Sequence, residues 1–200
     1  MGHRFTEITF TDPVKAVQER MGSRAGYARR EGGNVVSNDQ LGPSEAAFIA
    51  ARDSFYIATV SERGWPYVQH RGGPKGFVRA LDENTIGFAD FSGNRQYISV
   101  GNLAADNRVS LFFMDYPNRT RLKLLGRVGL AGAGDGELLS RLEIPGYRAR
   151  VERGMVITVE AFDWNCPQHI TPRFTAEEVE AAAAPLRARI AHLEAELARG

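Results

Sequence analysis

Between residues 54 and 91 the chain repeats one pattern: a short apolar or alternating segment, a polar turn, and a second such segment. The segments are SFYIATVSE and PYVQHRG around a turn at 62–64, and GFVRALD and TIGFADF around a turn at 82–84. Short segments rich in β-branched and aromatic residues and bounded by turn residues form strands, and neighbours joined by short turns pair as hairpins. The sequence therefore predicts two successive antiparallel hairpins.

Three further strand patterns follow the hairpins. RVSLFFMDY and RLKLLGRVGLAG flank a turn at Pro117-Asn118, MVITVEAFDW closes the series, and QYISVGNLAAD has the period of a connecting helix. Six to seven antiparallel strands in so short a span leave no exposed edge if they close into a small barrel. We therefore expect a mainly β fold with flanking helices, built on a small antiparallel barrel.

The segments outside the strands predict helices at both ends. Asp12-Pro13 opens a short helical pattern in an N-terminal arm over residues 1–43, and Ser44 is a candidate N-cap for EAAFIAARD, the first helix of a domain over 44–174. Thr175 and Glu178 have the spacing of a capping box at the start of a C-terminal helix over 175–200. This helix has an apolar stripe about two heptads long, a length that favours packing on the barrel or on a partner subunit over a free coiled coil. The stripe consists of Leu186, Ile190, Leu193 and Leu197.

The charge balance and the single cysteine limit the classes of function. The 200 residues include 25 Lys and Arg and 24 Asp and Glu, a formal net charge of +1, so no global field favours nucleic acid or an anionic membrane. We expect a cytoplasmic protein, because the sequence starts without an apolar signal segment and has no run of about 18 apolar residues. Cys166 alone cannot form an intrachain disulfide or a Cys-only metal site.

Three cations stand near glycines in the stretch from Trp65 to Asn102, namely Arg71, Lys75 and Arg95. Arginine binds phosphate oxygens through a planar fork, and glycine lets backbone N–H groups approach the same ligand. A helix that begins after Arg95 would add the positive end of its dipole. We interpret this stretch as a phosphate seat, although Arg71 and Lys75 alone also fit a solvated strand end and turn.

The remaining reactive side chains do not define a second site. His70 and His169 have no His, Cys or carboxylate at the short spacings of metal sites, so we predict no metal. Cys166 precedes Pro167 without an obvious base nearby, which is more typical of a structural cysteine than of a nucleophile. No acid–base pair or triad stands out, so the catalytic residues stay unassigned.

Together, the segments HRGGPKGF, FADFSGNRQYISVGNL, NRVSLFFMDYP and DWNCPQHITPRF resemble the pyridoxamine 5'-phosphate oxidase-like FMN-binding split barrels, and more closely their uncharacterised flavin-nucleotide-binding branch. The resemblance covers Ser44 to Phe174. It implies a six-stranded antiparallel split β-barrel that forms a homodimer, with one FMN in each groove between subunits. The residues that it implicates in cofactor binding are Gln69, His70, Arg71, Lys75, Arg95, Gln96, Ser99 and Asn102, and, from the partner subunit's late segment, Asn165, Gln168, His169 and Arg173.

The resemblance further implies an FMN-dependent oxidoreductase that acts on an unidentified small molecule. Flavin itself carries hydride and electron chemistry, so a missing triad does not argue against an enzyme. Two alternatives stay open: a flavin-binding protein without turnover, and the same barrel holding a deazaflavin or haem. The alanine- and leucine-rich C-terminus stands where true pyridoxamine-phosphate oxidases have an Arg-Leu-x-Pro pattern, which argues against the vitamin B6 reaction.

Overall fold

The computed structural model describes residues 3–31, 38–132, 134–164 and 167–199. The chain divides into two compact units, one made of Met1–Met114 with Arg121–Cys166 and the other of Asp115–Thr120 with Pro167–Gly200. The first unit contains most of the sheet and helices α1 to α6, and the second contains α7. None of the described helices combines the length and the apolar character that crossing a bilayer would need.

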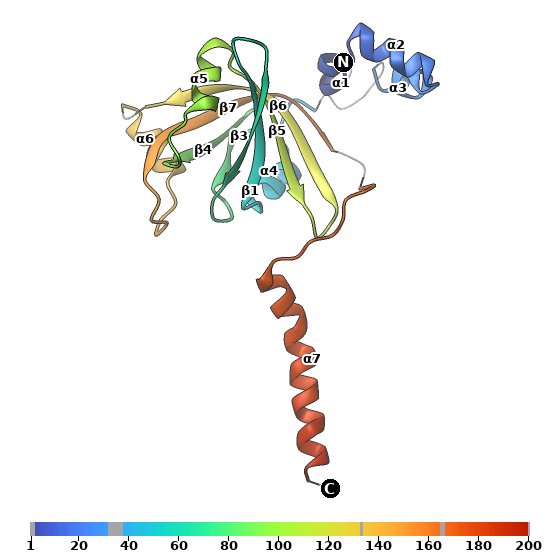
Figure 1. The fold of residues 1–200 in the computed structure, drawn as a ribbon, viewed down its shortest axis with the longest axis vertical. Helices are drawn as coiled ribbons and strands as arrows, with labels where there is room; N and C mark the ends of the chain where they lie inside the picture. Colours follow the sequence, from blue (N-terminus) through green and yellow to red (C-terminus); the bar gives the residue numbers. More distant parts are fainter. Residues whose placement is uncertain (1–2, 32–37, 133, 165–166, 200) are drawn as a thin grey trace. The chain divides into compact units, whose positions relative to one another are not determined.

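Seven strands form one sheet in the order β2-β1-β5-β6-β7-β4-β3 (Figure 1). The two predicted hairpins are confirmed, because β1 pairs with β2 and β3 pairs with β4, both antiparallel. The strand bounds are β1 Ser54–Val60, β2 Pro66–Gly72, β3 Val78–Asp82, β4 Thr85–Phe91, β5 Arg108–Asp115, β6 Thr120–Ala131 and β7 Val151–Trp164.

The sheet has one strand more than the six-stranded barrel predicted, and it is open. Both hairpins join the same sheet through their inner strands, since β1 pairs with β5 and β4 pairs with β7, which leaves β2 and β3 outermost. Among the described residues these two edge strands do not pair with each other. The β1–β5 register is short and runs over Tyr56–Ala58 against Ser110–Phe112.

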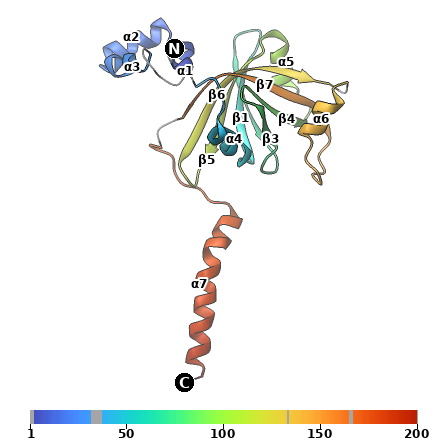
Figure 2. The same ribbon diagram turned by 180° about the vertical axis from the view of Figure 1, so that it is seen from behind.

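The helices lie around this sheet. α4 packs on β3, α5 packs on β1, and α6 packs on β4 and β7 (Figures 1 and 2). At the N-terminal end, α1 contacts β7, and α3 contacts both α1 and α2. The helix bounds are α1 Arg4–Thr9, α2 Asp12–Arg20, α3 Arg24–Glu31, α4 Pro43–Ala50, α5 Ile98–Ala105, α6 Gly136–Leu142 and α7 Ala176–Leu197.

The helix starts test two capping predictions. The prediction that Ser44 caps α4 is wrong, because the helix begins at Pro43 with Gly42 as N-cap. Proline is favoured at the first helical position, where its missing N–H has no intrahelical partner to lose. The Gly42 N–H donates to the Glu45 carboxylate at 3.0 Å. The predicted capping box of α7 is confirmed, since Thr175 Oγ1 accepts from the backbone N–H of Glu178 at 3.2 Å.

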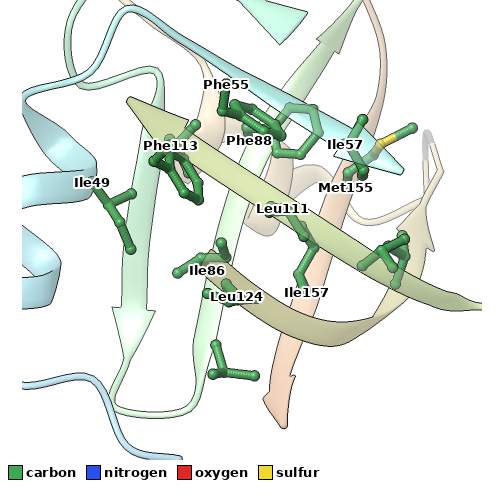
Figure 3. Close-up of a cluster of buried hydrophobic side chains, with 14 of the residues drawn as sticks. Ile49, Phe55, Ile57, Ile86, Phe88, Leu111, Phe113, Leu124, Met155 and Ile157 are labelled. Carbon is green, nitrogen blue, oxygen red and sulfur yellow. The ribbon is translucent and has the colours of Figure 1, made fainter. Parts of the chain in front are cut away.

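The core is built around four buried phenylalanines from three strands and one turn. Phe55 of β1 is stacked on Phe113 of β5 at 5.0 Å between ring centroids, and meets Phe88 of β4 edge-on at 5.2 Å. Phe77, before β3, stacks on Phe55 at 5.8 Å. Ile49 of α4 is fully buried against this cluster, as Figure 3 shows. Aromatic burial of this kind fixes the hairpins against the central strands and so sets the position of β2 and β4.

Candidate functional site

A pocket of about 210 Å³ lies beside the edge strand β2. Its lining comes from alternate residues of β2, the end of β4, the loop 93–97, the first turn of α5 and Glu152 of β7. The pocket therefore brings together sequence segments that are far apart in the chain. It includes five of the predicted cofactor-binding residues, which are Gln69, Arg71, Arg95, Gln96 and Ser99.

The pleat of β2 decides which of its residues reach the pocket. Successive side chains of a strand point to opposite faces. Tyr67, Gln69 and Arg71 line the pocket, whereas His70 is exposed and meets the Tyr56 ring edge-on at 5.6 Å between centroids. The structure thus separates His70 from its predicted neighbours Gln69 and Arg71.

A buried carboxylate holds Arg71 in place. Asp90 of β4 is 4% exposed, and its two oxygens bind two guanidinium groups, Oδ1 that of Arg71 and Oδ2 that of Arg153 at 3.4 Å from Nε. Arg153 stands opposite Asp90 in the β4–β7 register. Arg71 is itself largely buried, and its Nε has no hydrogen-bond partner among the described residues. A buried charged donor without a partner is rare, and because less than 1 Å² of Nε is accessible, only other atoms of the Arg71 side chain can face a ligand in the pocket.

The loop between β4 and α5 has a strained backbone. Arg95 and Tyr97 both have positive φ, at 60° and 54°, a conformation that non-glycine residues rarely adopt and that often accompanies binding sites. Between them, the Gln96 N–H donates to Asn94 Oδ1 at 3.2 Å. Arg95 Nε donates to the Tyr97 hydroxyl at 3.3 Å, and this bond raises the pKa of the guanidinium. The loop therefore holds a permanent positive charge at the pocket rim.

Glu152 anchors the far side of the same loop. Its carboxylate accepts from Ser92 Oγ at 2.9 Å and from the Tyr97 hydroxyl at 3.1 Å, and Arg153 donates to its other oxygen at 2.9 Å. The hydrogen bond from Ser92 is the main cause that lowers the pKa of Glu152, with further lowering by Tyr97 and Arg153. Asp90 and Glu152 together share Arg71 and Arg153, so Arg95 is the cation among the described lining residues whose charge is left for a ligand.

The start of α5 adds backbone donors. The first intrahelical hydrogen bond of α5 runs from the Gly101 N–H to the Tyr97 carbonyl at 2.8 Å. The N–H groups of residues 98–100 therefore have no carbonyl acceptor within the helix. Such a helix end carries a partial positive charge and binds anions. Ser99 is buried and donates through Oγ to Gln69 Oε1 at 2.8 Å, which ties the helix to β2.

The other predicted residues lie outside this pocket. Lys75 is exposed on the turn between β2 and β3, and Asn102 is buried one turn into α5, where it donates to Thr59 Oγ1 at 3.0 Å. Asn165 lies outside the described residues. Gln168, His169 and Arg173 belong to the second unit, in which the Arg173 guanidinium stands 4.9 Å from the Tyr116 ring centroid.

Sequence reasoning missed three charged or polar residues that organise the pocket: Asp90, Glu152 and Arg153. One signal was present, because Asp90 interrupts the otherwise apolar strand TIGFADF and a buried acid requires a partner. Glu152 and Arg153 precede the predicted start of the last strand at Met155, whereas β7 begins at Val151.

Fold and pocket together define a mainly β protein with flanking helices, an open antiparallel sheet and a small polar pocket, lined by two arginines and two acids, between an edge strand and a helix start. The family profile described as Pyridoxamine 5'-phosphate oxidase matches residues 41–160, well over half of the chain. The chain therefore belongs to the pyridoxamine 5'-phosphate oxidase family, as its sequence segments predicted.

Solved structures resemble the fold at low sequence identity. The HupZ protein of Group A Streptococcus is 16% identical with a TM-score of 0.51, over 67% of this chain and 99% of that one. A Clostridium acetobutylicum protein related to general stress protein 26, of the pyridoxinephosphate oxidase family, is 16% identical with a TM-score of 0.46, over 68% of this chain and 94% of that one. No protein with a curated description matches this sequence.

Proposed function

We propose that the pocket binds the phosphate of FMN and that the protein is an FMN-dependent oxidoreductase acting on a small molecule. Membership of the pyridoxamine 5'-phosphate oxidase family supports a flavin-related role. The observation that carries the proposal is the pocket lining, which brings Arg71, Arg95 and the first turn of α5 together beside β2.

The charges of the pocket fit a phosphate monoester. Such a group carries close to two negative charges near neutral pH and accepts hydrogen bonds on three oxygens. The Arg71 side chain, the Arg95 guanidinium and the first turn of α5 all line the pocket and can supply donors to it. Asp90 and Glu152 take up the charge of Arg71 and Arg153, so Arg95 supplies the positive charge that the described pocket leaves for the ligand.

The size of the pocket fits only part of FMN. Pockets for small molecules commonly measure about 300–1,000 Å³, whereas this one has about 210 Å³. It accommodates the phosphate and part of the ribityl chain, with Gln69, Gln96 and Ser99 near them. The ring would extend beyond the pocket, and we propose that a second copy of the chain covers it with its late segment, the region of Gln168, His169 and Arg173. This is a homodimer with cofactor at the subunit interface.

When bound, FMN supplies hydride-transfer and single-electron chemistry that protein side chains lack. The residues of this chain bind and orient it: the arginines fix the phosphate, and the Ser99–Gln69 bond fixes the helix start against β2. The described pocket contains no pair of groups that we assign as catalytic acid and base.

The test compares FMN with riboflavin, which lacks the phosphate. Arg95→Ala is expected to weaken FMN binding by about 1.5–3 kcal/mol, which is roughly 10- to 150-fold, and to leave riboflavin affinity unchanged. Arg63→Ala, which removes the same charge from the exposed turn between β1 and β2, is the matched control and should change neither affinity. Equal effects of Arg95→Ala on both ligands, or none on FMN, would refute the phosphate assignment.

A second measurement separates an oxidoreductase from a flavin-binding protein without turnover. The FMN-loaded protein is mixed anaerobically with NADH or NADPH and with a panel of organic donors, and the flavin absorbance is followed. Bleaching faster than that of free FMN supports the enzyme. No acceleration with any donor would leave binding of FMN as the function.

A further inference from the structure

Helix α7 carries an apolar seam that the described chain leaves exposed. None of its residues is buried, and Leu186, Ile190 and Leu197 are 68%, 55% and 81% exposed. The seam follows a regular repeat, with steps of four and three residues between neighbours. Its members are Val179, Ala183, Leu186, Ile190, Leu193 and Leu197. Alternating steps of four and three define the heptad positions d and a of a coiled coil.

We propose that α7 pairs with α7 of a second copy of this chain as a parallel two-stranded coiled coil. The heptad positions favour this geometry. The a positions are Ala183, Ile190 and Leu197, and the d positions are Val179, Leu186 and Leu193, so the central heptad has a β-branched residue at a and leucine at d. A β-branched residue at a with leucine at d is the combination typical of parallel dimers, because each packs well into the hole that the facing helix offers there.

The charges beside the seam are complementary between two copies. In a parallel pair, the g position of one helix faces the e position five residues later in the other. Arg189 is at g and Glu194 is at e, so each helix places a cation opposite an anion of its partner. Arg187, at another e position, already forms an ion pair with Glu180 of its own helix.

An antiparallel pair would also match opposite charges, so the length of the seam selects the direction. If Leu186 faced Leu197 and Ile190 faced Leu193 in an antiparallel pair, Val179 and Ala183 would lie beyond the partner's last seam residue. A parallel pair instead joins every seam residue with its own counterpart. A second antiparallel register, with Leu186 facing Ile190 and Val179 facing Leu197, would also join the whole seam, but it sets Arg187 opposite Arg187 and Arg189 opposite Arg189. The parallel direction therefore joins the whole seam without these like-charge contacts.

Pro185 does not obstruct this pairing. Proline removes one intrahelical hydrogen bond, but α7 continues through it from Ala176 to Leu197. In the heptad Pro185 is at position c, on the side away from the seam. Its effect falls on the solvent face of the helix.

A coil of two to three heptads is weak alone, so the pairing needs a second copy held nearby. The inference therefore rests on the homodimer of the proposed function, because the dimer would hold the two α7 helices near each other and so raise their effective concentration. The coiled coil in turn links the two copies through a contact that does not involve the flavin pocket.

The test uses cysteine cross-linking of the full chain with Cys166→Ser as background. Leu197→Cys places identical thiols face to face in a parallel pair, whereas Ala195→Cys, two residues earlier at the outer f position, is the matched control. Under mild oxidation at low protein concentration, the covalent dimer of Leu197→Cys is expected to form at least 10-fold faster than that of Ala195→Cys. Equal rates, or no dimer with either, would overturn the proposal.

Charge exchange then tests the direction. Arg189→Glu is expected to slow the cross-linking of Leu197→Cys, because it places Glu opposite Glu194 of the second copy, and adding Glu194→Arg should restore the rate. In an antiparallel pair each change would meet a like charge, so the double variant would be slower still, which would overturn the parallel arrangement.

FMN titration and sedimentation separate this inference from the proposed function. Leu186→Glu with Ile190→Glu should abolish the cross-link of Leu197→Cys while FMN affinity stays unchanged. A protein that cross-links through α7 but binds no FMN retains the inference and loses the proposed function. A protein that sediments as a dimer and binds FMN, yet does not cross-link, retains the function and loses the inference.

Discussion

Replacing Asp90 by asparagine removes the charge that holds two arginines while nearly preserving the shape of the side chain. Asp90 has a side chain 5% exposed, and the side chains of its partners Arg71 and Arg153 are 14% and 20% exposed. Removing one partner of a buried ion pair costs about 3–5 kcal/mol, because the other charge stays buried without compensation. Both arginines keep some contact with water, so we expect the lower end, about 3 kcal/mol of unfolding free energy for the ligand-free protein.

Urea denaturation followed by tryptophan fluorescence measures this loss, with an unchanged m-value as evidence that the folded state is intact. Glu7→Gln is the control, because Glu7 pairs with Arg4 and their side chains are 43% and 45% exposed, so removing the charge should barely move the midpoint. Adding Arg71→Gln to Asp90→Asn should recover at least about 1 kcal/mol, since the uncompensated cation is then gone. A loss below about 1 kcal/mol for Asp90→Asn, or additive effects in the double variant, would refute the reasoning.

Two further predictions concern the sheet and the loop. Gly126→Ala should lower the unfolding free energy by about 1–3 kcal/mol in urea denaturation, because its Cβ would stand 2.5 Å from the Thr158 carbonyl oxygen. Gly129→Ala on the same strand, with its nearest contact at 4.0 Å, should have little effect, and equal losses would contradict this explanation. Ser92→Ala should raise the pKa of Glu152 towards its ordinary 4.5, measured by carboxyl ¹³C NMR. The stability that comes from this lowered pKa is present above pH 4.5 and is lost on acidification. The variant should therefore lose less stability in acid than the unmodified protein. An unchanged pKa of Glu152 would show that Ser92 does not lower it.

The strands could be predicted from local pattern, whereas the closure of the sheet could not. Both hairpins follow from alternation and turn residues within 54–91. The strand patterns themselves number seven, and the prediction of six came from the family resemblance. Whether the outer strands meet depends on the tilt and stagger of the whole sheet, which are long-range properties that no local period encodes. The short helices α1, α3 and α6 were missed because few apolar residues repeat within them.

Some residues of the pocket could also be predicted from local sequence, whereas others depend on how the strands pair. Arg71 and Arg95 could be found from residue type and neighbouring glycines, because the chemistry of phosphate binding favours arginine in such segments. Asp90 and Arg153 were missed as a pair because they meet only through the β4–β7 register, more than sixty residues apart in the chain. Gln69 and His70 are adjacent in sequence, but the pleat assigns them to opposite faces.

The left-handed backbone at Arg95 and Tyr97 has a consequence for engineering this protein. Each such residue costs on the order of 1–3 kcal/mol relative to a relaxed conformation, a strain that glycine would relieve. Selection for thermal tolerance alone would therefore favour glycine at these two positions and would remove the rim cation together with the strain. Stabilising libraries built on this scaffold should keep both positions fixed, because the gain in stability there would come at the expense of the proposed ligand contact.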